Sequence, residues 1–73
     1  MPVDSLTNEE KISIIQSHIK NIEYNKFNAE LNLIEENATT SPNANIVSAS
    51  NETIEKANLQ IAALEAEIAA LEE

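Results

Sequence analysis

The sequence predicts an all-α protein, an antiparallel hairpin of two long helices that pack like a coiled coil. Three observations predict this fold class. Apolar residues recur at helical spacing in the last third of the chain, a second helical stripe occupies the first half, and a Ser-Pro pair marks a corner between them. Glycine is absent from the 73 residues, which also favours long helices. We therefore expect a single small domain.

The C-terminal stripe has the spacing of a coiled-coil seam. Its apolar residues advance in steps of 3, 4, 3, 4 and 3, namely Ile54, Ala57, Ile61, Leu64, Ile68 and Leu71. Val47 and Ser50 continue the stripe backwards at the same spacing. Isoleucine, leucine and alanine at these positions bury one side of a helix against another helix. The sequence therefore predicts a helix whose apolar side must be covered.

The first helix is expected to start at a capping box formed by Thr7 and Glu10, and to span residues 7–37. Its apolar residues follow a helical period: Ile12, Ile15, Ile19, Ile22, Phe27, Leu31 and Ile34. Four of them, Ile12, Ile19, Phe27 and Ile34, are separated by 7, 8 and 7 residues. This is close to 3.67 residues per turn and predicts a straight helix rather than a left-handed supercoil.

The corner between the helices offers two interpretations. In the first, residues 38–41 form a turn, Ser41 caps the second helix and Pro42 is its first residue, so that this helix covers residues 42–73. In the second, a polar loop runs over 38–50 and Ser50 is the cap. The first is favoured, because Val47 and Ser50 already continue the seam and such a long loop is unusual in a compact hairpin. Residues 1–6 are expected to form an N-terminal tail.

Folding the two helices about this turn brings the stripes together. Residues whose numbers add to about 80 are expected to lie level, as in Ile34 with Val47, Phe27 with Ile54, Ile19 with Ile61, Ile15 with Leu64, and Ile12 with Ile68. The expected helix–helix interface comprises Ile12, Ile15, Ile19, Ile22, Phe27, Leu31, Ile34, Val47, Ile54, Ala57, Ile61, Leu64, Ile68 and Leu71. The agreement of two stripes with one turn position supports the hairpin.

Each helix carries more apolar surface than one hairpin seam can cover. On the first helix, Ile14, Tyr24 and Leu33 are expected to point away from the seam. On the second, Leu59 and several alanines form another face of mostly small residues. So short a chain buries little surface alone. We therefore expect association with a helical protein partner or with copies of itself, either as a four-helix bundle or as a larger helical assembly.

Composition argues against several classes of function. The net charge is −9 and arginine is absent, so phosphate backbones and anionic membranes would be repelled, and neither nucleic acid nor membrane is expected as a partner. Cysteine is absent, and the single histidine, His18, lacks the spacing of a metal or catalytic motif. We expect no enzyme activity, catalytic residue, metal, cofactor or small-molecule substrate.

Several segments of the first half resemble small uncharacterised proteins of marine bacteriophages, particularly those that infect cyanobacteria. The segments are L-T-x-E-E-K-I from Leu6, N-I-E-Y from Asn21, L-x-L-I-E-E-N-A from Leu31, and the restart at Ser41-Pro42. The resemblance implies a phage accessory or virion protein and brings no catalytic residues. Because the N-terminal residues lack the pattern of a signal peptide and no apolar run is long enough to span a bilayer, we expect the chain in the host cytoplasm or in the virion.

The resulting hypothesis is a structural or assembly protein that acts by helix packing. An acidic inhibitor or adaptor that binds a basic host protein is the alternative, and the net charge of −9 favours it. An antitoxin or regulator is a weaker third option, because no basic DNA-binding segment is present.

Overall fold

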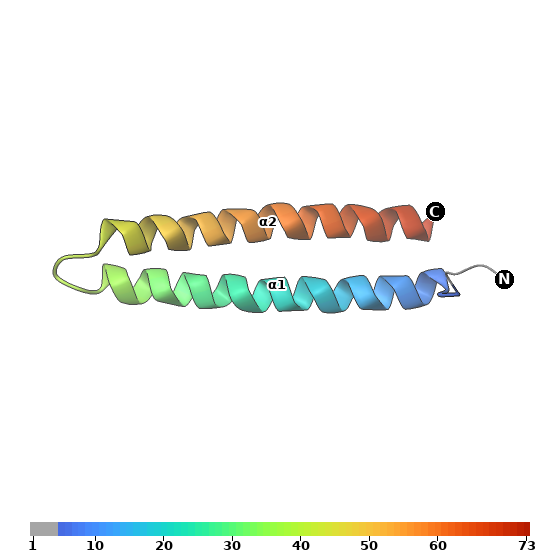
Figure 1. Cartoon of the computed structure of the whole chain (residues 1–73), viewed down its shortest axis with the longest axis horizontal. Helices are drawn as coiled ribbons and strands as arrows, with labels where there is room; N and C mark the ends of the chain where they lie inside the picture. Colours follow the sequence, from blue (N-terminus) through green and yellow to red (C-terminus); the bar gives the residue numbers. More distant parts are fainter. Residues whose placement is uncertain (1–4) are drawn as a thin grey trace.

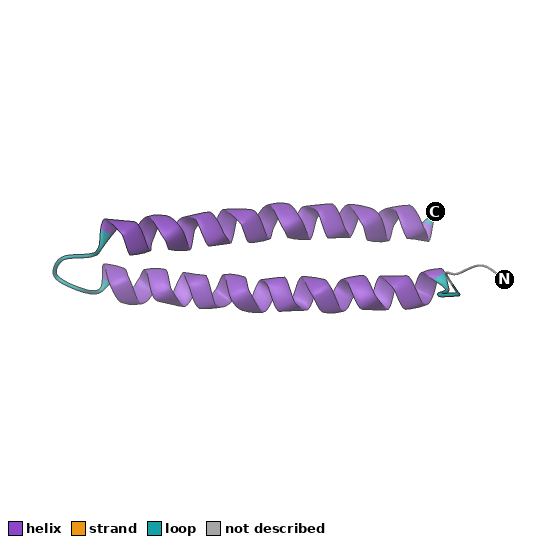
Figure 2. Ribbon diagram, in the orientation of Figure 1, coloured by secondary structure: helices purple, strands orange, loops and turns teal. Residues whose placement is uncertain are grey.

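Two antiparallel helices of nearly equal length make up the described part of the chain. The computed structural model describes residues 5–73, in which α1 spans Asn8–Asn37 and α2 spans Ala44–Glu72. The helices lie side by side along their whole length (Figure 1), and residues 5–73 contain no strand (Figure 2). The predicted all-α hairpin is confirmed. Of the expected N-terminal tail, residues 1–4 lie outside the described part.

The hairpin is a thin rod with an open end and a turn end. Its Cα atoms extend over 61 × 18 × 15 Å, and the start of α1 and the end of α2 lie together at the open end (Figure 1). There the side-chain amide of Asn8 donates a hydrogen bond to the carbonyl oxygen of Leu71 at 3.1 Å. We call two residues level when they lie on opposite helices at the same height along the rod. The numbers of such residues add to about 79, as those of Asn8 and Leu71 do. The sequence-based register is within one residue of this value.

The first turn of α1 contains the predicted capping box. The Thr7 hydroxyl accepts a hydrogen bond from the backbone amide of Glu10 at 3.1 Å, and the Glu10 carboxylate accepts one from the Thr7 amide at 3.0 Å. Two amides that the helix leaves unpaired are thereby satisfied. Glu9 and Glu10 also place negative charge at the positive end of the helix dipole. The start of α1 is thus determined by local sequence.

The turn over residues 38–43 is built without glycine. The Ala38 amide donates back to the carbonyl oxygens of Ile34 and Glu36, and the Thr39 hydroxyl donates to that of Glu36 at 2.8 Å. These bonds satisfy carbonyls at the C-terminus of α1. No residue of 5–73 has a positive φ, so the chain reverses through conformations that any residue can adopt.

The start of α2 differs from the sequence-based prediction. The helix begins at Ala44 and Asn43 is its N-cap, so Ser41 is not the cap and Pro42 precedes the helix. The Asn43 side-chain oxygen accepts hydrogen bonds from the amides of Asn45 at 2.9 Å and Ile46 at 3.4 Å. Asparagine caps helices as well as serine does, and here it satisfies two amides at once. The alternative loop to residue 50 is wrong.

Replacing Asn43 with alanine is expected to destabilise the hairpin by about 1 kcal/mol, because both capping bonds are lost. Urea unfolding followed by circular dichroism at 222 nm would measure this. Ser41→Ala is the matched control and should change stability little, since Ser41 lies outside the helix and is exposed. A larger loss from Ser41→Ala would contradict the assignment of Asn43 as the cap.

Candidate protein-interaction surface

On α2, the side that faces α1 is the side that the heptad spacing indicates. Ala57 is buried, as is Ser50, which the sequence placed on the same stripe. The other α2 residues of the expected interface are half-buried: Val47, Ile54, Ile61, Leu64, Ile68 and Leu71. The contact line therefore runs along all of α2 at heptad spacing.

The open-end half of α1 also packs as the spacing indicates. Its half-buried apolar residues are Ile12, Ile15, Ile19 and Ile22. By the register, Ile19 lies level with Ile61, and Ile22 with Ala57. One shallow hollow between the helices is lined by both Ile22 and Ala57, consistent with this register. Most of the aliphatic contact in the hairpin thus lies in the half nearer the chain ends.

The turn half of α1 departs from the prediction. Phe27, Leu31 and Ile34 were expected in the interface, but 59%, 36% and 64% of their surfaces are exposed. The inward positions belong instead to Lys26, Ala29, Leu33 and Glu36, of which Ala29 is buried and the others are half-buried. Leu33, expected to point away from the seam, therefore lies in it.

The physical reason is the geometry of the contact line. Two helices that stay in contact along their length keep a period of 3.5 residues, and this period continues from Ile22 to Lys26 and Ala29. The apolar pattern instead advances five residues, from Ile22 to Phe27, a rotation of roughly 140° about the helix axis. That irregular step was the signal in the sequence that the large apolar residues leave the seam.

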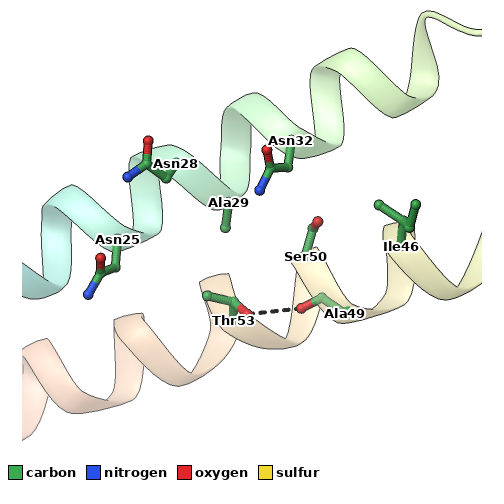
Figure 3. A pocket seen from close by; sticks show the side chains of 8 residues that line it. All are labelled: Asn25, Asn28, Ala29, Asn32, Ile46, Ala49, Ser50 and Thr53. Atoms are coloured by element: carbon green, nitrogen blue, oxygen red, sulfur yellow. Dashed lines mark hydrogen bonds between the residues drawn. The ribbon is translucent and has the colours of Figure 1, made fainter.

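The small residues at the seam let the helices approach closely in the turn half. Ala29, Ser50 and Ala57 are 6%, 7% and 4% exposed, and they are the buried residues of the described chain. Figure 3 shows Ala29 and Ser50 pointing toward the opposite helix. Large side chains at these positions would hold the helices further apart.

Beside this close approach runs an open groove rich in amides. Asn25, Asn28 and Asn32 line it from α1, and Thr53 donates its hydroxyl to the Ala49 carbonyl at 3.0 Å on the α2 side (Figure 3). The groove offers hydrogen-bonding groups but no acid, base or nucleophile paired with a base. It therefore has no evident catalytic chemistry.

Four exposed apolar residues in the turn half of α1 form a continuous stripe. Tyr24, Phe27, Leu31 and Ile34 advance in steps of 3, 4 and 3, and we call them the outer stripe. Tyr24 is 70% exposed. The outer stripe lies roughly 150° around α1 from the seam, at 100° per residue. In this half of α1 most of the large apolar side chains are therefore outside, whereas Lys26, Ala29 and Glu36 lie in the seam together with Leu33.

The outward side of α2 carries a stripe with the same spacing. Leu59, 67% exposed, is followed in steps of 3, 4 and 3 by Ala62, Ala66 and Ala69, which are also exposed. We call these four residues the alanine stripe. It lies in the open-end half of the hairpin, whereas the outer stripe of α1 lies in the turn half. Two complementary apolar faces, one large and one small, are thus exposed on opposite sides of the rod.

Other kinds of site find no support in the described residues. His18 is exposed, and residues 5–73 contain no group of three or more histidine, cysteine, aspartate or glutamate side chains arranged to hold a metal ion. Neither α1 nor α2 combines the length and hydropathy that a membrane span requires.

The features that stand out in the described residues are therefore the exposed apolar faces of the rod. In comparisons with known proteins, no family model, curated protein or solved structure matches this chain.

Proposed function

We propose that this chain is a non-enzymatic assembly module that binds helical protein surfaces, including further copies of itself. The observation that supports this most strongly is the outer stripe. A hairpin built to act alone would place Phe27 and Ile34 in its seam, where Lys26 and Ala29 lie instead. Large apolar side chains kept on an outer face favour contact with another protein.

The exposed area fits a reversible contact. With side-chain areas of about 150–250 Å² for the aromatic residues, the outer stripe exposes roughly 400 Å². Covering this area is worth on the order of 10 kcal/mol, close to the roughly 4–15 kcal/mol that association costs in lost freedom. One such contact is therefore weak, and assembly depends on protein concentration.

The resemblance to marine phage proteins supports a setting in which such a module is used. A phage accessory or virion protein of this kind would act in the host cytoplasm or within the particle, by packing against helices. The acidic adaptor remains the second candidate, because the chain carries a net charge of −9. Most of its carboxylates are exposed, but they occupy both helices and do not form one acidic face.

Sedimentation equilibrium of the full chain, from about 10 µM to 1 mM, tests the proposal. The weight-average mass is expected to rise with concentration, because the outer stripe becomes covered. A Phe27→Ser, Ile34→Ser double variant should remain monomeric. The matched control is Ile14→Ser, which removes an apolar side chain, 47% exposed, from the same helix but outside the outer stripe.

Two results would count against the assembly module. One is a chain that stays monomeric throughout this range, and the other is a double variant that associates as well as the native chain. The acidic adaptor predicts the first of these, together with binding to poly-lysine that weakens as salt is raised.

A further inference from the structure

We propose that the outer stripe of α1 packs on the alanine stripe of α2 in a second copy. The second copy lies alongside the first, with its open end and turn end reversed. Because each contact joins two different faces, further copies can add side by side in a head-to-tail manner. This inference rests on the proposed assembly function and names its partner, its two faces and its register.

The first argument is shape. Both stripes advance in steps of 3, 4 and 3, so their side chains can form successive layers along two helices in contact. One stripe carries two aromatic and two aliphatic side chains, and the other carries Leu59 and three alanines. Large side chains opposite small ones give close packing without voids. Two outer stripes facing each other would place large residues opposite large ones.

The second argument is register. Leu59 and Ala69 lie level with about residues 20 and 10 of α1, because level residues have numbers that add to about 79. The outer stripe spans residues 24–34, on the other side of the middle of α1, which lies near residue 22. Turning a second copy end for end about that level brings the two stripes together with the hairpins fully overlapped.

In this arrangement each α1 residue meets the α2 residue of the second copy numbered about 35 higher. The layers pair Tyr24 with Leu59, Phe27 with Ala62, Leu31 with Ala66, and Ile34 with Ala69. The full overlap of the rods and the match of all four layers follow from the same shift.

The third argument is charge. One step beyond Tyr24, the same shift places Lys20 opposite Glu55 of the second copy, and both side chains are exposed. Residues that flank the seam of two parallel helices contact a residue five positions away from the level one, so Glu23 and Glu30 fall beside Ala63 and Ala70. A like-charge pair also arises between Glu35 and Glu65, at an exposed edge where it costs only a few tenths of a kcal/mol.

Competing self-associations satisfy fewer of these conditions. In one alternative, the outer stripes of two copies pack against each other in antiparallel fashion about residue 29. This would place Glu30 against Glu30 of the second copy, and the two α1 helices would overlap only over residues 21–37. The alanine stripe would stay uncovered. Two hairpins pointing the same way, with Phe27 opposite Ala66, would be offset by about 14 residues and overlap over about half their length.

The arrangement is open-ended. The outer stripe lies roughly 150° from the seam, whereas a square four-helix bundle needs its two contact faces about 90° apart. Each copy therefore offers α1 on one side and α2 on the other, and both faces are used by different neighbours. Contacts of this head-to-tail kind produce filaments, or rings where the rotation closes.

Disulfide trapping tests the register, because the native chain has no cysteine. The variant carries Phe27→Cys with Ala62→Cys. Within one copy these positions lie on opposite sides of the rod and about 15 Å apart along it, too far for an internal disulfide. Mild oxidation is expected to give a ladder of linked multimers on a non-reducing gel. The matched control, Phe27→Cys with Ala66→Cys, should give at least five-fold less.

A charge-reversal cycle tests the same register with the outer stripe intact. Lys20→Glu and Glu55→Lys are each expected to weaken association several-fold in sedimentation at low salt, and the double variant should return to within about two-fold of the native chain. Glu55→Lys lowers the net negative charge, so without the specific contact it would strengthen association rather than weaken it.

The outcomes separate this inference from the proposed function. A stronger ladder from the Ala66→Cys control, equal linking by Phe27→Cys alone, or a charge cycle without rescue would overturn the head-to-tail register while the chain still associates. A native chain that remains monomeric would overturn both.

Discussion

Replacing Ile19 with aspartate is expected to unfold the hairpin. Ile19 is half-buried in the aliphatic half of the seam, level with Ile61. Removing the isoleucine side chain loses part of the 2–5 kcal/mol typical of core truncations, and the carboxylate must then either lose hydration or push the helices apart. A combined loss of about 3 kcal/mol or more is a large fraction of the stability of so small a domain. Loss of the circular dichroism signal at 222 nm, at low micromolar protein, would measure it.

The same substitution at Phe27 is the informative comparison. Both residues belonged to the interface predicted from sequence, but Phe27 is 59% exposed. Phe27→Asp should therefore lower the stability of the dilute hairpin by less than about 1 kcal/mol, as surface substitutions do. It should weaken association at high concentration instead. Equal unfolding by the two variants in dilute solution would show that Phe27 lies in the seam after all.

Enlarging Ala57 is expected to have the second large effect. Ala57 is 4% exposed and lies level with Ile22, at the point where a large residue of α1 meets a small one of α2. A leucine at position 57 would have to force the helices apart or adopt a strained rotamer, at a cost of about 1–3 kcal/mol. Lost contact would extend to neighbouring layers, because the two helices keep one continuous contact line.

Ala63→Leu is the control for Ala57→Leu. Residue 63 is an exposed alanine on the same helix, outside both the seam and the alanine stripe, so helix propensity changes equally in the two variants. Urea unfolding of both variants would isolate the packing effect. Similar midpoints for the two would contradict the close approach of the helices at Ala57.

Much of the fold could be predicted from the sequence because its signals are local or periodic. The capping box at Thr7 depends on residues three apart, and its bonds form as predicted. The seam of α2 keeps an unbroken heptad from Val47 to Leu71, so its inward side was evident without the partner helix. The register was predicted within one residue, although the start of α2 was placed two residues too early.

The cap of α2 was assigned wrongly because two local signals compete. Ser41-Pro42 is a common helix start, and Asn43 is an equally good cap two residues later. In the structure Asn43 satisfies two amides, at 2.9 and 3.4 Å. Propensity alone does not rank two such caps, since the difference lies in the bonds that each makes.

The seam in the turn half of α1 was assigned wrongly for a different reason. Apolar size favours Phe27, Leu31 and Ile34 over Lys26, Ala29 and Glu36 as buried residues. The structure reverses this order, with Ala29 buried at 6% exposure and Ile34 exposed at 64%. Hydropathy ranks residues one at a time. The seam, however, must follow one continuous contact line along the whole helix, and that line passes through Ala29.

The sequence by itself determined the two helices, the capping of α1 at Thr7, the inward side of α2 and the register of the hairpin. Only the tertiary structure decided which of two stripes on α1 faces its partner. A pair of packed helices must keep one continuous contact line, so the Ile12–Ile22 half carries the seam on through Ala29 and Leu33. Tyr24, Phe27, Leu31 and Ile34 then lie on the outer face, where covering them requires another molecule.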